Sequence, residues 1–136
     1  QLMCEFKTAY AKYFNSKYHR NGHFWGDRFR STLVEDDAHA LACLRYIDRN
    51  PVRAGLVRHP RDWPYESYSP YTSAVGHELL DFVPHPAYLS LSRDVKRRQK
   101  MYSDFVMEDA HEDLTGVLPR LRVFGSPQFT DAVLAK

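Results

Sequence analysis

A tyrosine and an asparagine in the segment YIDRNPVRAGLV are spaced in a way that suits catalysis. Tyr46 and Asn50 are four positions apart, so a continuous helix would place them on one face, one turn apart. A tyrosine hydroxyl becomes a useful nucleophile when a base removes its proton or a metal polarises the phosphate that it attacks. An amide oxygen is a hard donor of the kind that Mg²⁺ and Mn²⁺ prefer. The spacing alone favours a structural interpretation, in which Tyr46 packs in the core and Asn50 caps the following turn.

Basic and aromatic residues are interleaved in the first part of the chain. Residues 7–30 hold six basic residues against one acidic residue, and residues 45–61 hold five against one, whereas the two signs nearly balance from residue 73 onward. Basic side chains neutralise phosphates, and aromatic faces stack on unpaired bases. The pattern therefore fits single-stranded nucleic acid, and it fits equally an aromatic sheet core with charges that face water. The candidate DNA contacts are Lys7, Lys12, Arg28, Arg30, Arg45 and Arg49.

Several classes of protein are disfavoured by what the sequence lacks. No apolar run approaches the roughly 20 residues that a membrane-spanning helix needs, so we expect a cytoplasmic protein. Cys4 and Cys43 have no neighbouring cysteine of the CxxC kind, which argues against a disulfide scaffold or a zinc site. The sequence contains neither a glycine-rich phosphate loop nor a GxSxG motif, so a nucleotide hydrolase or a serine hydrolase is not expected.

The elements that must position these residues are indicated by apolar spacing. From Leu2 to about Tyr18 the apolar residues recur at steps of three and four, which predicts an amphipathic helix with its three lysines off the apolar stripe. Asn21-Gly22 is a turn signal, because glycine readily adopts the positive φ of tight turns. The run HFWGDRFRSTLV is aromatic and β-branched, and it predicts either one strand or a hairpin within about 23–34.

Capping residues and a proline set the limits of the helix that carries the tyrosine. Asp36 or Asp37 can cap its start, and we expect it to run to about Asn50. Pro51 disfavours helical geometry at the preceding residue and has no N–H, so the helix is predicted to end there. A short helical turn, PVRA, is predicted to follow and to be closed by Gly55.

Prolines also organise the rest of the chain. Three of them predict an irregular segment over 59–72, after which helices are expected over about 91–108 and 111–118. Ser126 as a cap and Pro127 as the first helical residue predict a last helix at the C-terminal end.

Three ordered segments together resemble a known family. They read YAKYFNSKYHRNGHFWGDRFRSTLVEDD, LRYIDRNPVRAGLV and HPRDWPYESY, and they are similar to the REP-associated tyrosine transposases of bacteria, which are single-tyrosine HUH transposases. The resemblance is close over residues 5–72 and weaker toward the C-terminal end, where RLRVFGSPQFTDAVL is similar to the family's ending.

The resemblance implies a DNA transposase that acts on single-stranded or hairpin, REP-like DNA. Tyr46 matches the nucleophile that forms a 5′-phosphotyrosine intermediate, and Asn50 matches an amide that can complete a Mg²⁺ or Mn²⁺ site. The implied fold is α+β with an antiparallel sheet, and homodimers are common in this class. By position, residues 1–72 would form the C-terminal part of the catalytic domain and residues 73–136 a helical C-terminal extension.

The chain departs from the family pattern in its metal ligands. In the family the two HUH histidines precede the residue that matches Gln1, and no HxH pair occurs in these 136 residues. We therefore expect an N-terminally incomplete, mostly helical fragment that has the nucleophile and lacks the metal site, and that alone neither cleaves nor joins DNA. Two alternatives stay open: a non-catalytic module that binds single-stranded or hairpin DNA, and a structural remnant that does neither.

Overall fold

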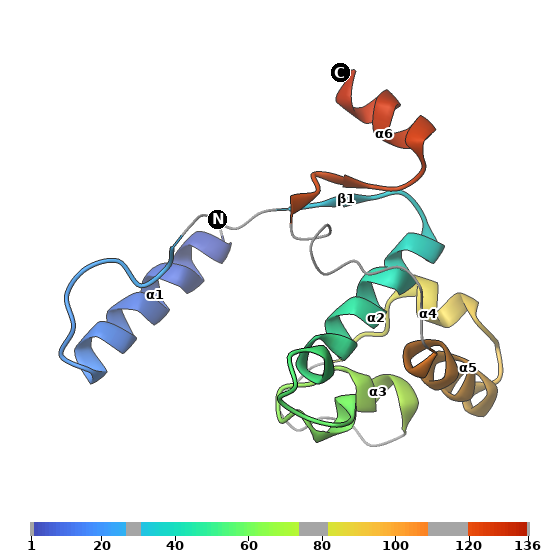
Figure 1. The fold of residues 1–136 in the computed structure, drawn as a ribbon, viewed down its shortest axis with the longest axis horizontal. Coiled ribbons are helices and arrows are strands. Elements are labelled where there is room, and N and C mark those ends of the chain that lie inside the picture. Colours follow the sequence, from blue (N-terminus) through green and yellow to red (C-terminus); the bar gives the residue numbers. More distant parts are fainter. Residues whose placement is uncertain (1, 27–30, 74–81, 109–119, 136) are drawn as a thin grey trace. The chain divides into compact units, whose positions relative to one another are not determined.

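The chain divides into two compact units, residues 1–31 and residues 32–136. The computed structural model describes residues 2–26, 31–73, 82–108 and 120–135. Figure 1 shows the elements of both units. The functional division predicted at residue 72 stays a prediction.

The first unit is built on one long helix. Helix α1 (Leu2–Lys17) matches the predicted amphipathic helix. It ends in a Schellman motif, because His19 adopts the left-handed conformation at φ +50° and the Arg20 amide donates to the Asn15 carbonyl over 2.9 Å. Gly22 has φ +104°, as the predicted turn requires.

Residues 23–26 do not form the predicted strand. Their aromatic rings pack back on α1 instead, with the ring centroid of Phe24 at 4.5 Å from that of Phe14. The Trp25 indole N–H donates to the Lys7 carbonyl over 2.9 Å, which ties this segment to the helix. Packing on the helix thus replaces a strand ladder here, and the prediction for residues 27–30 lies outside the described residues.

The second unit begins with a short strand and the helix that carries the tyrosine. Strand β1 (Leu33–Val34) leads to Asp36, whose carboxylate accepts from the His39 amide over 2.9 Å and caps helix α2 (Asp37–Arg53). This cap confirms the predicted start of the helix. Acceptance of an otherwise unpaired N–H at the first turn stabilises the start of the helix.

The prediction that this helix stops before Pro51 is wrong, because α2 passes through the proline to Arg53. Proline's fixed φ of about −65° is compatible with a helix. Helical geometry at the residue before a proline is disfavoured but still allowed, so the helix can continue. The next turn is closed by a Schellman motif in which Gly55 donates to Val52 over 3.0 Å and Leu56 donates to Pro51 over 3.0 Å. Gly55 has φ +70°, as predicted for a helix end, but it ends α2 itself and no separate turn forms.

The remaining elements are short except for one helix. Instead of the predicted irregular segment over 59–72, the chain forms a 3₁₀ turn η1 (Pro60–Asp62) and helix α3 (Tyr68–Thr72). Helix α4 (Pro86–Ser90) precedes α5 (Val95–Met107), which lies within the helix predicted over 91–108. The helix predicted over 111–118 lies outside the described residues. Strand β2 (Val123–Phe124) and helix α6 (Pro127–Leu134) follow, with Ser126 as the cap of α6 as predicted.

The antiparallel sheet that we expected is not formed by the described residues. They form a two-stranded parallel sheet, in which Leu33 lies opposite Val123 and Val34 lies opposite Phe124. Parallel strands need a crossover connection, and here α2 to α5 lie between the two strands in the chain. The described residues are therefore mostly helical with one small sheet. This content of helices and strands is compatible with the α+β class, although the sheet is not the antiparallel one that we expected.

The core of the second unit is rich in tyrosine. Helices α3, α4 and α5 gather along one side of α2 (Figure 1), and the buried residues between them are Tyr68, Tyr71, Tyr88, Tyr102 and Val106. Leu41 and Leu44 of α2 pack against this cluster. Within the described residues, no helix has the length and apolar content needed to span a membrane.

Candidate functional site

Tyr46 and Asn50 lie on one unbroken helix. Because α2 continues through residue 50, the two side chains are one turn apart on the same face, as the spacing predicted. The core-facing Leu44 and Asp48 each lie two residues from Tyr46, which is about 200° around a helix. Tyr46 is half-buried and Asn50 is exposed.

The two arginines that flank Tyr46 and Asn50 face helix α5. The Arg45 guanidinium lies 4.5 Å from the centroid of the Phe105 ring. The Arg49 guanidinium donates to the carbonyls of Val106 and Glu108 over 3.2 and 2.8 Å. Arg49 therefore satisfies carbonyls at the C-terminal end of α5, where a cation is also favoured by the helix dipole. These contacts give both arginines a structural role in addition to the predicted contact with DNA.

A buried carboxylate joins three segments of the second unit. Asp48 is 4% exposed, and its two oxygens accept from the Ser67 hydroxyl over 2.6 Å and from the Tyr102 hydroxyl over 2.7 Å. Burial raises the pKa of the Asp48 carboxyl, and the two hydroxyl donors oppose that shift. Burial and the nearby carboxylate also raise the pKa of Tyr102, so its hydroxyl stays a donor at neutral pH. Asp48 thus fixes the orientation of α2 against α5.

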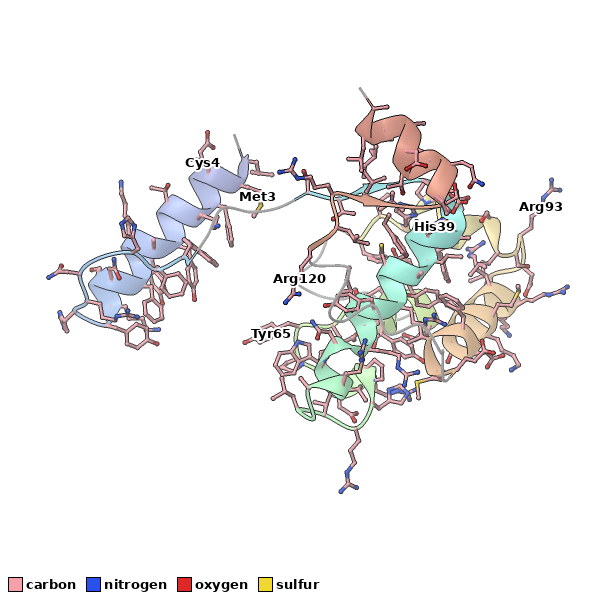
Figure 2. The ribbon with its side chains drawn as sticks, turned by 45° about the horizontal axis from the view of Figure 1, so that its top comes forward. Met3, Cys4, His39, Tyr65, Arg93 and Arg120 are labelled. Atoms are coloured by element: carbon pink, nitrogen blue, oxygen red, sulfur yellow. The ribbon has the colours of Figure 1, made fainter. Side chains whose placement is uncertain are left out.

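A cleft of about 170 Å³ opens beside Asn50 at the C-terminal end of α2. Its aromatic wall includes Tyr65, whose ring projects outward in Figure 2, and Tyr46 is not among the residues that line it. The lining residues are Ile47, Asp48, Asn50, Pro51, Trp63, Tyr65, Glu66 and Ser67. The helix therefore places the two predicted site residues on one face, while the cleft takes in only the asparagine.

The described residues do not assemble a divalent-cation site at the tyrosine. Mg²⁺ requires six oxygen ligands, several of them waters, and is usually held by one or two carboxylates. Of the two carboxylates that line the cleft, that of Asp48 already accepts from two hydroxyl groups, and one oxygen of Glu66 accepts from the Ser69 amide over 2.6 Å. Asn50 alone does not fit the role of a binding site, so we derive no step through a metal ion.

A second group of potential ligands lies at the other end of α2. Single atoms of Glu35, Asp36 and His39 lie within 4.8 Å of one another, and Figure 2 shows His39 near the start of the helix. Each carboxylate has a structural partner: Asp36 accepts from the amide and contacts the ring of His39, and Glu35 accepts from the amide and hydroxyl of Ser126. These contacts hold the start of α2 to the start of α6.

The first unit presents an aromatic face with lysines over its rings. The Lys7 nitrogen lies 5.1 Å from the Trp25 ring centroid, and the Lys17 nitrogen lies 5.4 and 5.5 Å from the ring centroids of Tyr13 and Tyr18. The expectation that all three lysines lie off the apolar stripe is therefore wrong for two of them. Lys12 does lie off it, since it is two residues from both Tyr10 and Phe14 in the helix.

The sequence-based search missed Lys17 as a member of this face. The signal was present, because Tyr13 and Lys17 have the four-residue spacing of helical neighbours, and the Lys17 ammonium donates to the Tyr13 hydroxyl over 3.0 Å. That hydrogen bond raises the pKa of Lys17. The predicted contacts Arg28 and Arg30 lie outside the described residues.

Comparison with known proteins gives one partial similarity. A protein from Haemophilus influenzae strain Rd, named "Putative REP-associated tyrosine transposase", is 39% identical to this chain over 54 residues. The matched stretch covers 40% of this chain and 31% of that protein. No protein-family model matches the chain, and no solved structure matches it. The chain thus resembles part of a transposase-like protein and covers less than a third of its length.

Proposed function

We propose that this chain supplies the nucleophile helix of a DNA transposase of the REP-associated tyrosine type. The observation that carries the proposal is the placement of Tyr46 on α2, half-buried, away from the core-facing residues and one turn before Asn50. The partial similarity to a protein named as a transposase of this type supports it. The substrate in this proposal is single-stranded or hairpin DNA.

In the proposed reaction the Tyr46 oxygen attacks a backbone phosphorus atom. The bond from phosphorus to the 3′ oxygen breaks, the strand leaves with a 3′ hydroxyl, and a 5′-phosphotyrosine link forms. The tyrosine proton passes to a base or to solvent, and the leaving oxygen gains a proton. The link conserves the energy of the phosphodiester, so a second 3′ hydroxyl can reverse the step. The Asn50 amide is proposed as a phosphate contact next to the nucleophile.

The test is the formation of a covalent adduct with DNA. The longest polypeptide encoded by the reading frame that contains this sequence is incubated with Mg²⁺ or Mn²⁺ and a labelled hairpin that has a single-stranded flank. The proposal expects a labelled band that survives denaturing electrophoresis, and its loss in Tyr46→Phe with binding unchanged, since only the hydroxyl is removed. The 136-residue chain alone is the control, and we expect no adduct from it.

Tyr65→Phe is a matched control for the tyrosine substitution. Tyr65 is exposed and lies in the same unit, so loss of its hydroxyl should leave the adduct intact. An adduct that persists in Tyr46→Phe would exclude Tyr46 as the nucleophile.

The alternative function is binding of single-stranded or hairpin DNA without chemistry. The basic aromatic face of the first unit favours it. It predicts binding that weakens steeply with added salt, and no adduct under any condition. If the protein neither binds DNA nor forms an adduct, both the transposase function and the DNA-binding function are excluded.

A further inference from the structure

The first unit has an exposed ring surface that its own residues do not bury. None of the α1 residues is buried, although the helix and the turn after it contribute seven aromatic rings. Figure 2 shows the ring side chains of this unit on the side of α1 away from Cys4. The rings are Phe6, Tyr10, Tyr13, Phe14, Tyr18, Phe24 and Trp25.

The rings differ in how far their neighbours enclose them. Phe14 and Phe24 are half-buried and pack on each other and on Tyr10. Tyr13 and Tyr18 are 56% and 53% exposed, so much of each ring is open to solvent. The partly buried rings of Phe14 and Phe24 therefore pack together, whereas the rings of Tyr13 and Tyr18 remain exposed and available for stacking.

The charge around the rings is strongly positive. Residues 2–26 contain Glu5 as a single acid against three lysines and an arginine. Lys17 lies over both outer tyrosines, and the Arg20 guanidinium lies 5.7 Å from the centroid of the Phe14 ring. A surface that combines open aromatic rings with cations is complementary to a chain of phosphates with unpaired bases.

We propose that the outer tyrosines Tyr13 and Tyr18, with Lys17 between them, form a base-stacking site for single-stranded DNA. Single-stranded DNA fits better than a duplex because bases in a duplex have no free face for the tyrosines. This inference rests on the proposed function for its choice of DNA as the partner. It adds a binding site that is separate from the nucleophile and that uses three residues not among the predicted DNA contacts.

The test measures the affinity of the 136-residue chain for three fluorescent probes by anisotropy. They are an eight-nucleotide oligothymidine, an abasic strand with the same number of phosphates, and a duplex of the same length. The proposal expects the oligothymidine to bind at least about tenfold more tightly than the abasic strand, because each stacked base contributes substantially to affinity. Equal affinity for the oligothymidine and the abasic strand would overturn it, and so would tighter binding of the duplex.

Two pairs of variants locate the site. Tyr13→Ala combined with Tyr18→Ala should weaken oligothymidine binding about tenfold or more and leave abasic binding unchanged. Val95→Ala, at an exposed position of α5 in the second unit, should change neither. Lys17→Gln should reduce the slope of log affinity against log salt by about 0.7. Lys96→Gln removes the same charge from an exposed position of α5 in the second unit and should leave the slope unchanged.

The outcomes separate this site from the proposed chemistry. Normal oligothymidine binding in the double tyrosine variant overturns the stacking site, whatever the adduct assay gives for Tyr46. Loss of binding in that variant supports the site even where no covalent adduct forms. A matched oligouridine that binds more than tenfold tighter than oligothymidine would overturn the choice of DNA. Circular dichroism of each variant establishes that α1 is intact.

Discussion

The two units use aromatic residues in opposite ways. In the second unit, four tyrosines are buried between α2, α3, α4 and α5, and their hydroxyls bond to groups on other elements. In the first unit, the rings pack on one another along a single helix and remain largely exposed. A high aromatic content therefore does not by itself indicate a core. The stabilisation that a ring provides is proportional to the apolar surface that is buried when the unit folds.

The two tryptophans make this comparison measurable, because Trp25 lies in the first unit and Trp63 in the second. In a Trp25→Phe background the fluorescence reports only the second unit, and in a Trp63→Phe background it reports only the first.

The largest effect is expected at the buried carboxylate. Asp48→Ala leaves the hydroxyls of Ser67 and Tyr102 without their acceptor, and each unpaired buried group costs about 1–3 kcal/mol. The free energy of unfolding reported by Trp63 in urea should fall by about 2–4 kcal/mol, and the Trp25 signal should not change. A loss below about 0.5 kcal/mol would show that the second unit does not depend on this network.

Asp48→Asn is the matched control for that substitution. The amide keeps an acceptor for Ser67 and a donor for the Tyr102 oxygen, so it should cost much less than alanine. Because burial raises the pKa of the Asp48 carboxyl above its ordinary 3.8, the folded chain holds this proton more tightly than the unfolded chain. The stability of the natural chain relative to Asp48→Asn should therefore fall as pH rises from about 4.

A smaller effect is expected where the ends of two elements meet. A Cβ atom on Gly125 would lie 2.6 Å from a Glu35 carboxylate oxygen and 2.8 Å from a carbon of the Phe129 ring. Gly125→Ala should therefore destabilise the second unit by about 1–3 kcal/mol, as overpacking does. Urea unfolding followed by Trp63 measures this. An unchanged midpoint would mean that the contact between Glu35 and Ser126 can be lost without cost to the unit.

The smallest effect is expected in the first unit and has the opposite sign. His19 holds a left-handed conformation at φ +50°, which costs a residue with a Cβ about 1–2 kcal/mol. His19→Gly removes that strain but gives the unfolded chain more freedom, so a net gain of about 0.5–1 kcal/mol is expected. The gain should appear in the Trp25 signal alone, and destabilisation would exclude the Schellman motif as the end of α1.

Local signals in the sequence predicted α1, α5, α6 and the start of α2, but not the short helices α3 and α4. Caps at Asp36 and Ser126 and the turn at Gly22 were predictable because each depends on a few adjacent residues. The parallel pairing of β1 with β2 was not predictable, since it joins two-residue strands about 90 positions apart. The continuation of α2 through Pro51 was not predictable from local preference, because proline disfavours helical geometry at the preceding residue without preventing it.

The candidate site was predictable only in part. The placement of Tyr46 and Asn50 on one face follows from their spacing, once α2 is continuous. The cleft at Asn50 depends on Trp63 and Glu66, which approach the helix only through the tertiary fold. The same is true of Asp48, whose partners lie 19 and 54 residues away in the chain.

Pro51 also affects the mechanical behaviour of α2. Proline has no N–H, so the Ile47 carbonyl receives no bond from residue 51, and the last turn is joined to the helix by one bond fewer than the turns before it. Amides beyond Pro51 should therefore exchange their hydrogens with solvent sooner than those beside Tyr46. We therefore expect the last turn of α2, which begins beside Asn50, to open more readily than the turn that carries Tyr46.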